Sequence, residues 1–116
     1  MEAMELYKQK IKLKPSDKHL HHKNEPHELA SLIHQAAFSP ALSEDSLNQV
    51  CDASKYFKFS GLCTNLLHLK HVRERLGPSS STKLIAVIAF PFGDIPNSFK
   101  LKEAEWAASQ GADALD

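Results

Sequence analysis

The stretch LIAVIAF at residues 84–90 decides the fold of this chain. It is apolar throughout and lacks the alternation of a strand with one face in water. A continuous apolar run is typical of a parallel strand that is covered on both faces. The segment PFGDIP at residues 91–96 follows it and is rich in turn-forming residues. We therefore predict a buried parallel strand that ends in a loop.

Helix-like and strand-like segments alternate on both sides of this stretch. Helices are predicted where apolar residues recur every 3.6 positions behind a capping residue, from near Asn24 with Leu29, Leu32 and Ile33 as its apolar stripe, and at 43–57, 67–76 and 98–110. Strands are predicted at 35–38, 59–64 and 84–90, and a fourth begins after Gly111. In the last helix, Phe99 and Leu101 are among the residues expected to pack.

Strands separated by helices of 10–15 residues form right-handed βαβ units and a parallel sheet. We therefore expect an α/β protein: the front half of a larger α/β barrel, with a helix, three strand–helix units and the start of a fourth parallel strand. The loops after the strands are where the chemistry of such a barrel is expected.

Residues 1–24 differ in composition from the rest. They hold six Lys against three acidic residues, with Pro15 interrupting the segment and no sustained period. We predict a flexible N-terminal extension at 1–24 and a truncated barrel domain at 25–116. His19, His21 and His22 lie in the extension, but their spacing fits no closed zinc motif, so no metal site is predicted.

Composition excludes several classes of function. The formal net charge is zero with His neutral, and there are only two Arg, so no basic surface for nucleic acid is expected. The two cysteines, Cys51 and Cys63, are too few for a disulfide framework and are expected to be buried free thiols. No apolar run approaches the ~20 residues that cross a bilayer. A cytoplasmic location is the expectation.

Other residues have ordinary structural interpretations. His68 and His71 share a helix face that the surrounding Lys and Arg predict to be solvated. Trp106 lies on an alanine-rich helix and is predicted to serve packing or a partner contact.

Four groups of residues stand in an order and spacing that resemble one enzyme family. They are 32–40 with 43–45, FSGLCTN at 59–65, AVIAFPFG at 86–93, and KLKEAEWA at 100–107 with GADALD at 111–116. Together they resemble the deoxyribose-phosphate aldolases, whose third strand typically ends in Gly-Phe-Pro-x-Gly. The likeness covers nearly the whole chain after residue 28, and well under half of a complete family member.

The resemblance implies a class I aldolase in a TIM barrel. Such an enzyme reversibly cleaves 2-deoxy-D-ribose 5-phosphate to acetaldehyde and D-glyceraldehyde 3-phosphate, in deoxyribonucleotide catabolism. A lysine on the sixth strand forms a Schiff base with the substrate carbonyl, so no metal or cofactor is implied. None of the twelve Lys of this chain aligns with that lysine. We therefore expect no turnover from this chain alone. The expected partner is a small phosphosugar, and a homo-oligomer is left open.

Asp116 is the catalytic residue that the resemblance implies. It matches the fourth-strand aspartate of the family, which relays protons during Schiff-base formation and C–C cleavage. The plain alternative is an ordinary terminal aspartate. Cys63, Asn65 and Phe90 are expected in the substrate pocket, with Cys63 more readily explained as a small buried apolar residue than as a nucleophile.

The first strand departs from the family, which usually has Ile-Asp-His-Thr there. His34, Gln35 and Ala36 stand in place of its polar residues, Ser39 replaces a frequent Lys, and Ala89 replaces the Gly before Phe-Pro in the third strand. These changes weaken the expectation of substrate binding. Two alternatives stand beside the aldolase interpretation: a non-catalytic truncated form or interaction fragment of the family, or another TIM-barrel lyase.

Overall fold

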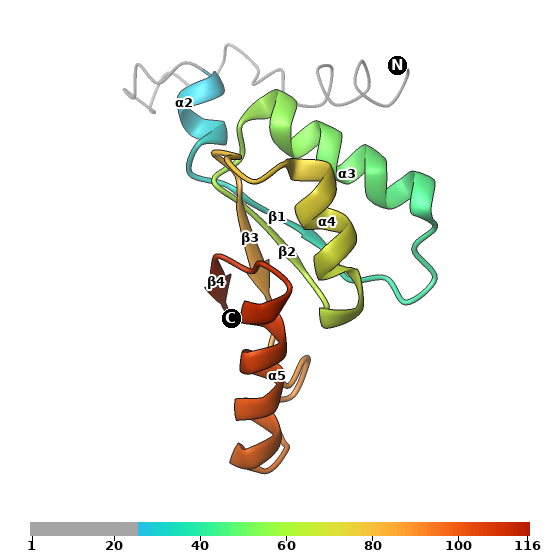
Figure 1. The fold of residues 1–116 in the computed structure, drawn as a ribbon. Helices are drawn as coiled ribbons and strands as arrows, with labels where there is room; N and C mark the ends of the chain where they lie inside the picture. Colours follow the sequence, from blue (N-terminus) through green and yellow to red (C-terminus); the bar gives the residue numbers. More distant parts are fainter. Residues whose placement is uncertain (1–25) are drawn as a thin grey trace.

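The computed structural model describes residues 26–116, so the predicted extension, its histidines and the N-cap Asn24 lie outside the described residues. Helices and strands alternate along the chain (Figure 1), in the order α2 (Pro26–Ala30), β1 (His34–Ala37), α3 (Glu44–Phe57), β2 (Gly61–Thr64), the 3-10 turn η1 (Leu66–His68), α4 (Leu69–Leu76), β3 (Lys83–Ala86), α5 (Asn97–Ser109) and β4 (Ala114–Leu115). No helix among residues 26–116 is long and apolar enough to span a membrane.

The four strands form one sheet in the order β1-β2-β3-β4, and every neighbouring pair is parallel. The register places Ala36, Cys63 and Ile85 in one row across β1, β2 and β3, and Ala114 of β4 continues that row. The predicted α/β architecture with a parallel sheet is confirmed. Within the described residues the sheet is open and forms part of a barrel.

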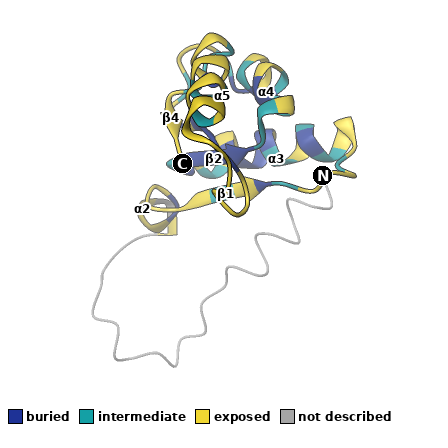
Figure 2. Ribbon diagram, turned by 90° about the horizontal axis from the view of Figure 1, so that it is seen from below, coloured by how far each residue is buried: buried dark blue, intermediate teal, exposed yellow. Residues whose placement is uncertain are grey.

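Helices α3 and α4 lie side by side over one face of the sheet and enclose the core (Figure 1). Buried residues are concentrated between these helices and the two central strands, whereas α5 is mostly exposed (Figure 2). The core cluster consists of Ala37, Leu47, Cys51, Leu62, Leu69, Val72, Leu76, Leu84, Ala86 and Ala107. Since side chains alternate along a strand, Cys63 and Ile85 point away from α3 and α4, and Gly61 occupies the same face. That face corresponds to the interior side of a barrel.

Helix α3 begins as its sequence predicts. The Oγ of Ser43 accepts a hydrogen bond from the backbone N–H of Ser46 at 3.1 Å, which satisfies one of the free donors of the first turn. Glu44 and Asp45 lie in that first turn, where the helix dipole favours negative charge. The helix ends at Lys58, whose φ of 57° is left-handed.

The apolar stripe predicted for the first helix is wrong. Helix α2 has only five residues, and Leu29, Leu32 and Ile33 are 40%, 73% and 41% exposed. Leu32 and Ile33 lie beyond its end, in a tight turn whose backbone N–H groups bond the carbonyls of Leu29 and Ala30. The chain therefore turns into β1 before a second helical turn can bring these side chains to one face.

Strand β3 ends at Ala86, four residues before the predicted end. The ladder continues for two more residues, because Val87 donates to the carbonyl of Thr64 and Ile88 to that of Asp116. Ala89 then adopts a φ of 53°, which turns the backbone away from the sheet. The apolar run is thus continuous in composition but not in conformation.

Helix α5 forms close to its predicted bounds, but its packing differs from the expectation. Phe99, Leu101 and Trp106 are 56%, 62% and 53% exposed, and Ala107 is the buried residue of this helix. Apolar side chains lie on several sides of α5, so no single face can bury them against the sheet.

Candidate active site at the carboxyl ends of the strands

The residues predicted for the site gather at the carboxyl-terminal edge of the sheet. Cys63 points to the interior face of β2, Asn65 follows that strand, and Phe90 follows β3. Asp116 follows β4 and is fixed to β3 by two backbone bonds: its N–H donates to the carbonyl of Ala86 at 2.9 Å, and its carbonyl accepts from Ile88 at 2.8 Å. The parallel sheet thus brings four residues from distant parts of the sequence to one edge.

Cys63 and Asp116 are close enough to interact electrostatically. Burial raises the pKa of the Cys63 thiol, and the negative charge of Asp116 raises it further. The thiol is only 8% exposed and makes no disulfide. A neutral thiol is a poor nucleophile, so the plain interpretation of Cys63 as a small apolar wall residue fits the geometry.

Two aromatic rings meet above the end of β2. Phe90, after β3, stacks on Phe38, after β1, with ring centroids 4.6 Å apart and planes inclined by 27°. Because β1 and β3 flank β2, this pair spans the central strand at its carboxyl end. Asn65 follows that strand and accepts a hydrogen bond at 3.3 Å from the Thr64 hydroxyl. An aromatic pair and an amide thus lie at the carboxyl end of the sheet.

The loop after β3 is held by a residue of α5. The carboxylate of Glu103 accepts the N–H of Ala89 at 3.1 Å, and the Ala89 carbonyl accepts from Gly93 at 2.7 Å. Ala89 therefore keeps its left-handed conformation although it carries a Cβ. The sequence offered no signal for this role of Glu103, because its partner lies in a different element.

The altered residues of β1 divide between the two faces of the sheet. His34 and Ala36 are exposed on the interior side, whereas Gln35 turns to α3 and accepts a hydrogen bond from the Ser54 hydroxyl at 2.8 Å. Opposite His34, Gly61 leaves little room for a side chain, because a Cβ there would lie 2.5 Å from the Cδ1 of Ile85 and 3.0 Å from the imidazole Cδ2 of His34. His34 is therefore the polar group that β1 contributes to the interior face.

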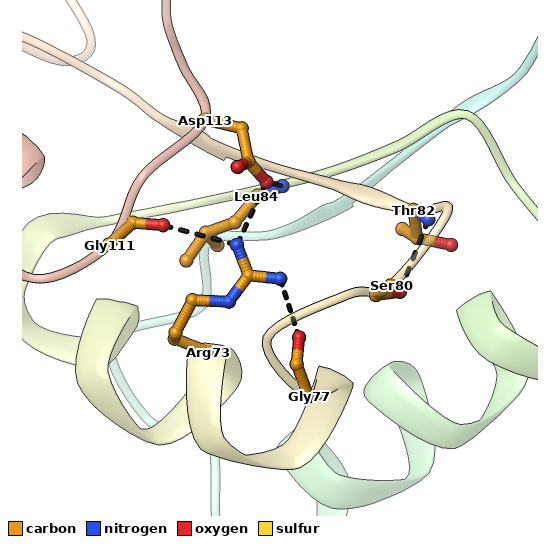
Figure 3. A network of polar contacts seen from close by, with 7 residues as sticks. All are labelled: Arg73, Gly77, Ser80, Thr82, Leu84, Gly111 and Asp113. Carbon is orange, nitrogen blue, oxygen red and sulfur yellow. Dashed lines mark hydrogen bonds and ion pairs between the residues drawn. The ribbon is translucent and has the colours of Figure 1, made fainter.

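A guanidinium on α4 links that helix to the start of β4 (Figure 3). Arg73 donates to the Gly111 carbonyl, the Asp113 carboxylate and the Gly77 carbonyl at 3.1, 2.9 and 2.9 Å. Sequence reasoning missed this network. Arg73 and Asp113 are 40 residues apart, and neither carries a local motif for the other.

The described residues contain no group of three side chains suited to a metal ion. His71, predicted to be solvated, is partly buried, and its Nε2 lies 2.7 Å from the Oδ1 of Asn48 on α3. That histidine joins two helices, which corrects the expectation of a solvated face.

A shallow apolar groove of about 460 Å³ lies between α5 and η1, the turn that follows the end of β2. Its lining residues are Leu66, Ile95, Phe99, Lys102, Glu103 and Trp106. It contains none of the predicted site residues.

Comparison with known proteins gives one consistent family. No protein-family model matches the chain. A deoxyribose-phosphate aldolase of Treponema denticola is 33% identical over 89 residues, covering 77% of this chain and 41% of that protein. A deoxyribose-phosphate aldolase 2 of Staphylococcus aureus is 33% identical over 87 residues, covering 75% of this chain and 39% of that protein. The chain thus spans about 40% of the length of these relatives.

Solved structures of similar fold point to the same family. The aldolase QR15 superimposes with a TM-score of 0.70 at 31% identity, covering 77% of this chain and 39% of that one. The tetrameric deoxyribose phosphate aldolase of Aeropyrum pernix gives 0.69 at 29% identity, covering 79% and 39%. A candidate deoxyribose-phosphate aldolase of Coccidioides immitis gives 0.75 at 21% identity, covering 98% and 45%, which shows the fold alone. Over about three quarters of its length, this chain is homologous to the deoxyribose-phosphate aldolases.

Proposed function

We propose that this chain supplies the first strands and one catalytic carboxylate of a deoxyribose-phosphate aldolase-like lyase. The reaction is the reversible cleavage of 2-deoxy-D-ribose 5-phosphate to acetaldehyde and D-glyceraldehyde 3-phosphate in deoxyribonucleotide catabolism. The position of Asp116 carries the proposal: it follows β4 at the carboxyl edge of the sheet and raises the pKa of the neighbouring Cys63 thiol. In barrels of this kind the chemistry is found at that edge.

Asp116 is assigned the movement of protons. In a class I aldolase the amine of a lysine condenses with the substrate carbonyl, water leaves, and the resulting iminium takes up the electron pair of the broken C–C bond. Each of these steps needs a proton delivered or removed close to the reacting atoms. A carboxylate at a strand end can accept and return that proton.

The walls of the pocket are assigned to three other residues. Cys63 contributes a neutral, buried surface beside Asp116. Phe90 and its stacking partner Phe38 contribute an apolar wall, and Asn65 contributes an amide at the end of β2. Such a mixture of apolar walls and a few polar groups suits a small sugar phosphate, whose own polar groups fix its orientation.

The Schiff-base lysine is assigned to a strand beyond those of this chain. The lysines of the described residues are spread over helices, loops and strand starts, such as Lys83 at the first position of β3, away from the edge that carries Asp116. We therefore infer that this chain alone has no turnover. The alternative of a non-catalytic interaction fragment is favoured by the exposed apolar residues of α5. A cytoplasmic location completes the proposal, and the tetrameric relative of A. pernix supports a homo-oligomer.

The proposal is tested in a chimera that joins this chain to the later strands of the T. denticola relative. Asp116→Asn keeps the size of the side chain but cannot exchange a proton, so turnover measured by acetaldehyde release should fall ~10²–10⁴-fold. The matched control is Asp94→Asn, which changes an exposed loop carboxylate and should leave turnover unchanged. Circular dichroism checks the fold of each variant.

Two outcomes would contradict the proposal. Full turnover of the Asp116→Asn chimera would remove the catalytic role of this residue. A chimera that folds but shows no turnover with Asp116 intact would show that the strands of this chain do not support the reaction.

A further inference from the structure

We propose that Arg73 and Asp113 are a positioning pair for Asp116. Together they fix the register in which β4 joins β3, and so hold the Asp116 carboxylate beside Cys63. The catalytic importance of this positioning rests on the proposed function of Asp116. The contacts that fix the register of β4 are independent of that function.

The Arg73 guanidinium holds three groups at once. One nitrogen, Nη1, donates to both the Gly111 carbonyl and the Asp113 carboxylate, while Nη2 donates to the Gly77 carbonyl at the end of its own helix. Figure 3 shows the guanidinium enclosed by these partners, with Gly111 and Asp113 on the chain that leads into β4. The planar fork of Arg can hold this set in one orientation, whereas an ammonium cannot.

Asp113 transmits this constraint to the sheet. Its Oδ2 accepts the backbone N–H of Leu84 at 2.9 Å, and its own N–H donates to the Leu84 carbonyl at 2.8 Å. Both backbone groups of one β3 residue are therefore taken by one residue of the incoming chain. A slip of β4 by one position would break both bonds and turn Asp116 to the opposite face, because side chains alternate along a strand.

Electrostatics are consistent with this arrangement. Partial burial would raise the pKa of Asp113, but the N–H of Leu84 and the guanidinium of Arg73 outweigh it and lower that pKa. The carboxylate is therefore charged at neutral pH and available to both donors.

Gly111 makes room for the guanidinium stem. Its φ is +91°, and a Cβ at this position would lie 2.8 Å from the Arg73 Cδ. A side chain at residue 111 would therefore push Arg73 away from the start of β4. The close approach of the helix to this turn depends on glycine in two ways, through backbone conformation and through space.

A second ion pair on the same helix provides a matched control. Arg75 lies two residues further along α4 and bonds the Asp52 carboxylate of α3 through two nitrogens. Its side chain is 46% exposed, against 19% for Arg73, and it has no contact with β4 among those described. Removing Arg75 therefore costs a charge and a helix–helix link without touching the position of Asp116.

Cys63 is a natural reporter of that position in the 116-residue chain. Its thiol pKa is raised by burial and by the Asp116 charge, so a carboxylate that moves away lowers this pKa. Below the pKa, the rate of alkylation follows the thiolate fraction. Alkylation by iodoacetamide as a function of pH, read by peptide mass in a Cys51→Ala background, therefore reports where Asp116 lies.

Variants of the pair and of Asp116 should change the alkylation profile of Cys63 in the same direction. Asp116→Asn, Arg73→Met and Asp113→Asn should each lower the apparent pKa of Cys63 and so make alkylation at pH 8 about threefold faster. Arg75→Met should leave it unchanged, and Arg73→Lys should restore part of the wild-type profile. Loss of the Arg73 cation alone would raise the thiol pKa, so a lowered value reports movement of Asp116.

The double variant separates positioning from simple stability. In the Asp116→Asn background, Arg73→Met should lower the Cys63 pKa no further, because the carboxylate whose position it sets is gone. A further drop would mean that the pair only keeps the fold closed over Cys63, and would overturn the proposal. An unchanged profile for both Arg73→Met and Asp113→Asn would also overturn it.

Asp113→Asn keeps the inference testable if Arg73→Met fails to fold, because the amide retains the size of the carboxylate and an oxygen for Leu84. The assay needs no turnover. A chimera that fails to cleave substrate would therefore refute the proposed function while leaving this result standing.

Discussion

Helices α4 and α5 each follow a strand of the same sheet, yet they are stabilised differently. In α4 the apolar residues Leu69, Val72 and Leu76 recur at intervals of three and four and are at most 3% exposed. In α5 the large residues Phe99 and Trp106 share one face and Leu101 lies on the opposite side, and each of the three is more than half exposed. One helix is part of the core, and the other rests on it through Ala107.

The difference shows that two helices in equivalent places can form for different reasons. The segment KLKEAEWAAS in α5 is rich in strong helix formers, so local propensity favours the helix even where packing is sparse. The apolar face of α4 matches the sheet, so burial supplies its stability. Substitutions should therefore act on α4 through packing and on α5 through the backbone.

The largest effect is expected from Leu69→Ala in α4. Leu69 is fully buried, so its truncation leaves a cavity and should lower the free energy of unfolding by about 2–5 kcal/mol. Leu101→Ala in α5 removes the same atoms from an exposed position and should change it by no more than about 0.5 kcal/mol. Urea unfolding followed by circular dichroism measures both. Equal losses would remove the contrast between the two helices.

A smaller, stabilising effect is expected from Ala89→Gly, at the point where Glu103 of α5 holds the loop. Ala89 has a φ of 53°, a conformation that costs an L-residue roughly 1–2 kcal/mol and glycine little. Glycine also gains conformational freedom in the unfolded chain, which offsets part of the relieved strain. The free energy of unfolding should therefore rise by about 0.5–1 kcal/mol.

The control for this change is Ala104→Gly inside α5, where glycine should cost about 1 kcal/mol because the helix depends on propensity. Urea unfolding gives both values. A loss of stability in Ala89→Gly would show that the left-handed turn carries no strain.

The smallest effect is expected from pH, through the two ion pairs of α4. Hydrogen bonds lower the pKa of Asp113 and of Asp52 below the usual value of 3.8. Each pair therefore stabilises the fold fully above that pH and loses its contribution as the pH falls through the lower folded value. Wild type should therefore melt at a higher temperature than Asp113→Asn at pH 7, and this difference should disappear in strong acid.

Asp52→Asn should show the same trend with a smaller gap at pH 7, because its pair is more exposed and better screened. Melting curves at low and high salt distinguish the two pairs, since salt should reduce the Asp52 gap more. A gap for Asp113→Asn that widened in acid would contradict this assignment.

Features that depend on neighbouring residues were predictable from the sequence. The Ser43 cap, the bounds of α3 and the presence of the two central strands follow from local chemistry and period, and the structure confirms them, although β3 ends four residues early. The carboxyl-edge placement of Cys63 and Asp116 followed from the resemblance together with the parallel topology. Their common location needed no information beyond the order of the strands.

Features that depend on distant residues were not predictable. The left-handed Ala89 depends on Glu103, 14 residues later, and the register of β4 depends on Arg73 of another element. The prediction of an apolar stripe on α2 was wrong because the helix ends before its residues can form a face. Periodicity shows which side chains could share a face, and only the tertiary structure decides whether that face is covered.

The place of Trp106 has a consequence for spectroscopy. It is the one tryptophan of the sequence, and it lies half exposed on α5 beside Phe99 and the groove, not in the core. Its fluorescence emission therefore reports the solvent exposure of α5 more than the unfolding of α3 and α4. A fluorescence change without a change in circular dichroism would mark an event on that helix alone, such as a molecule settling against its apolar side.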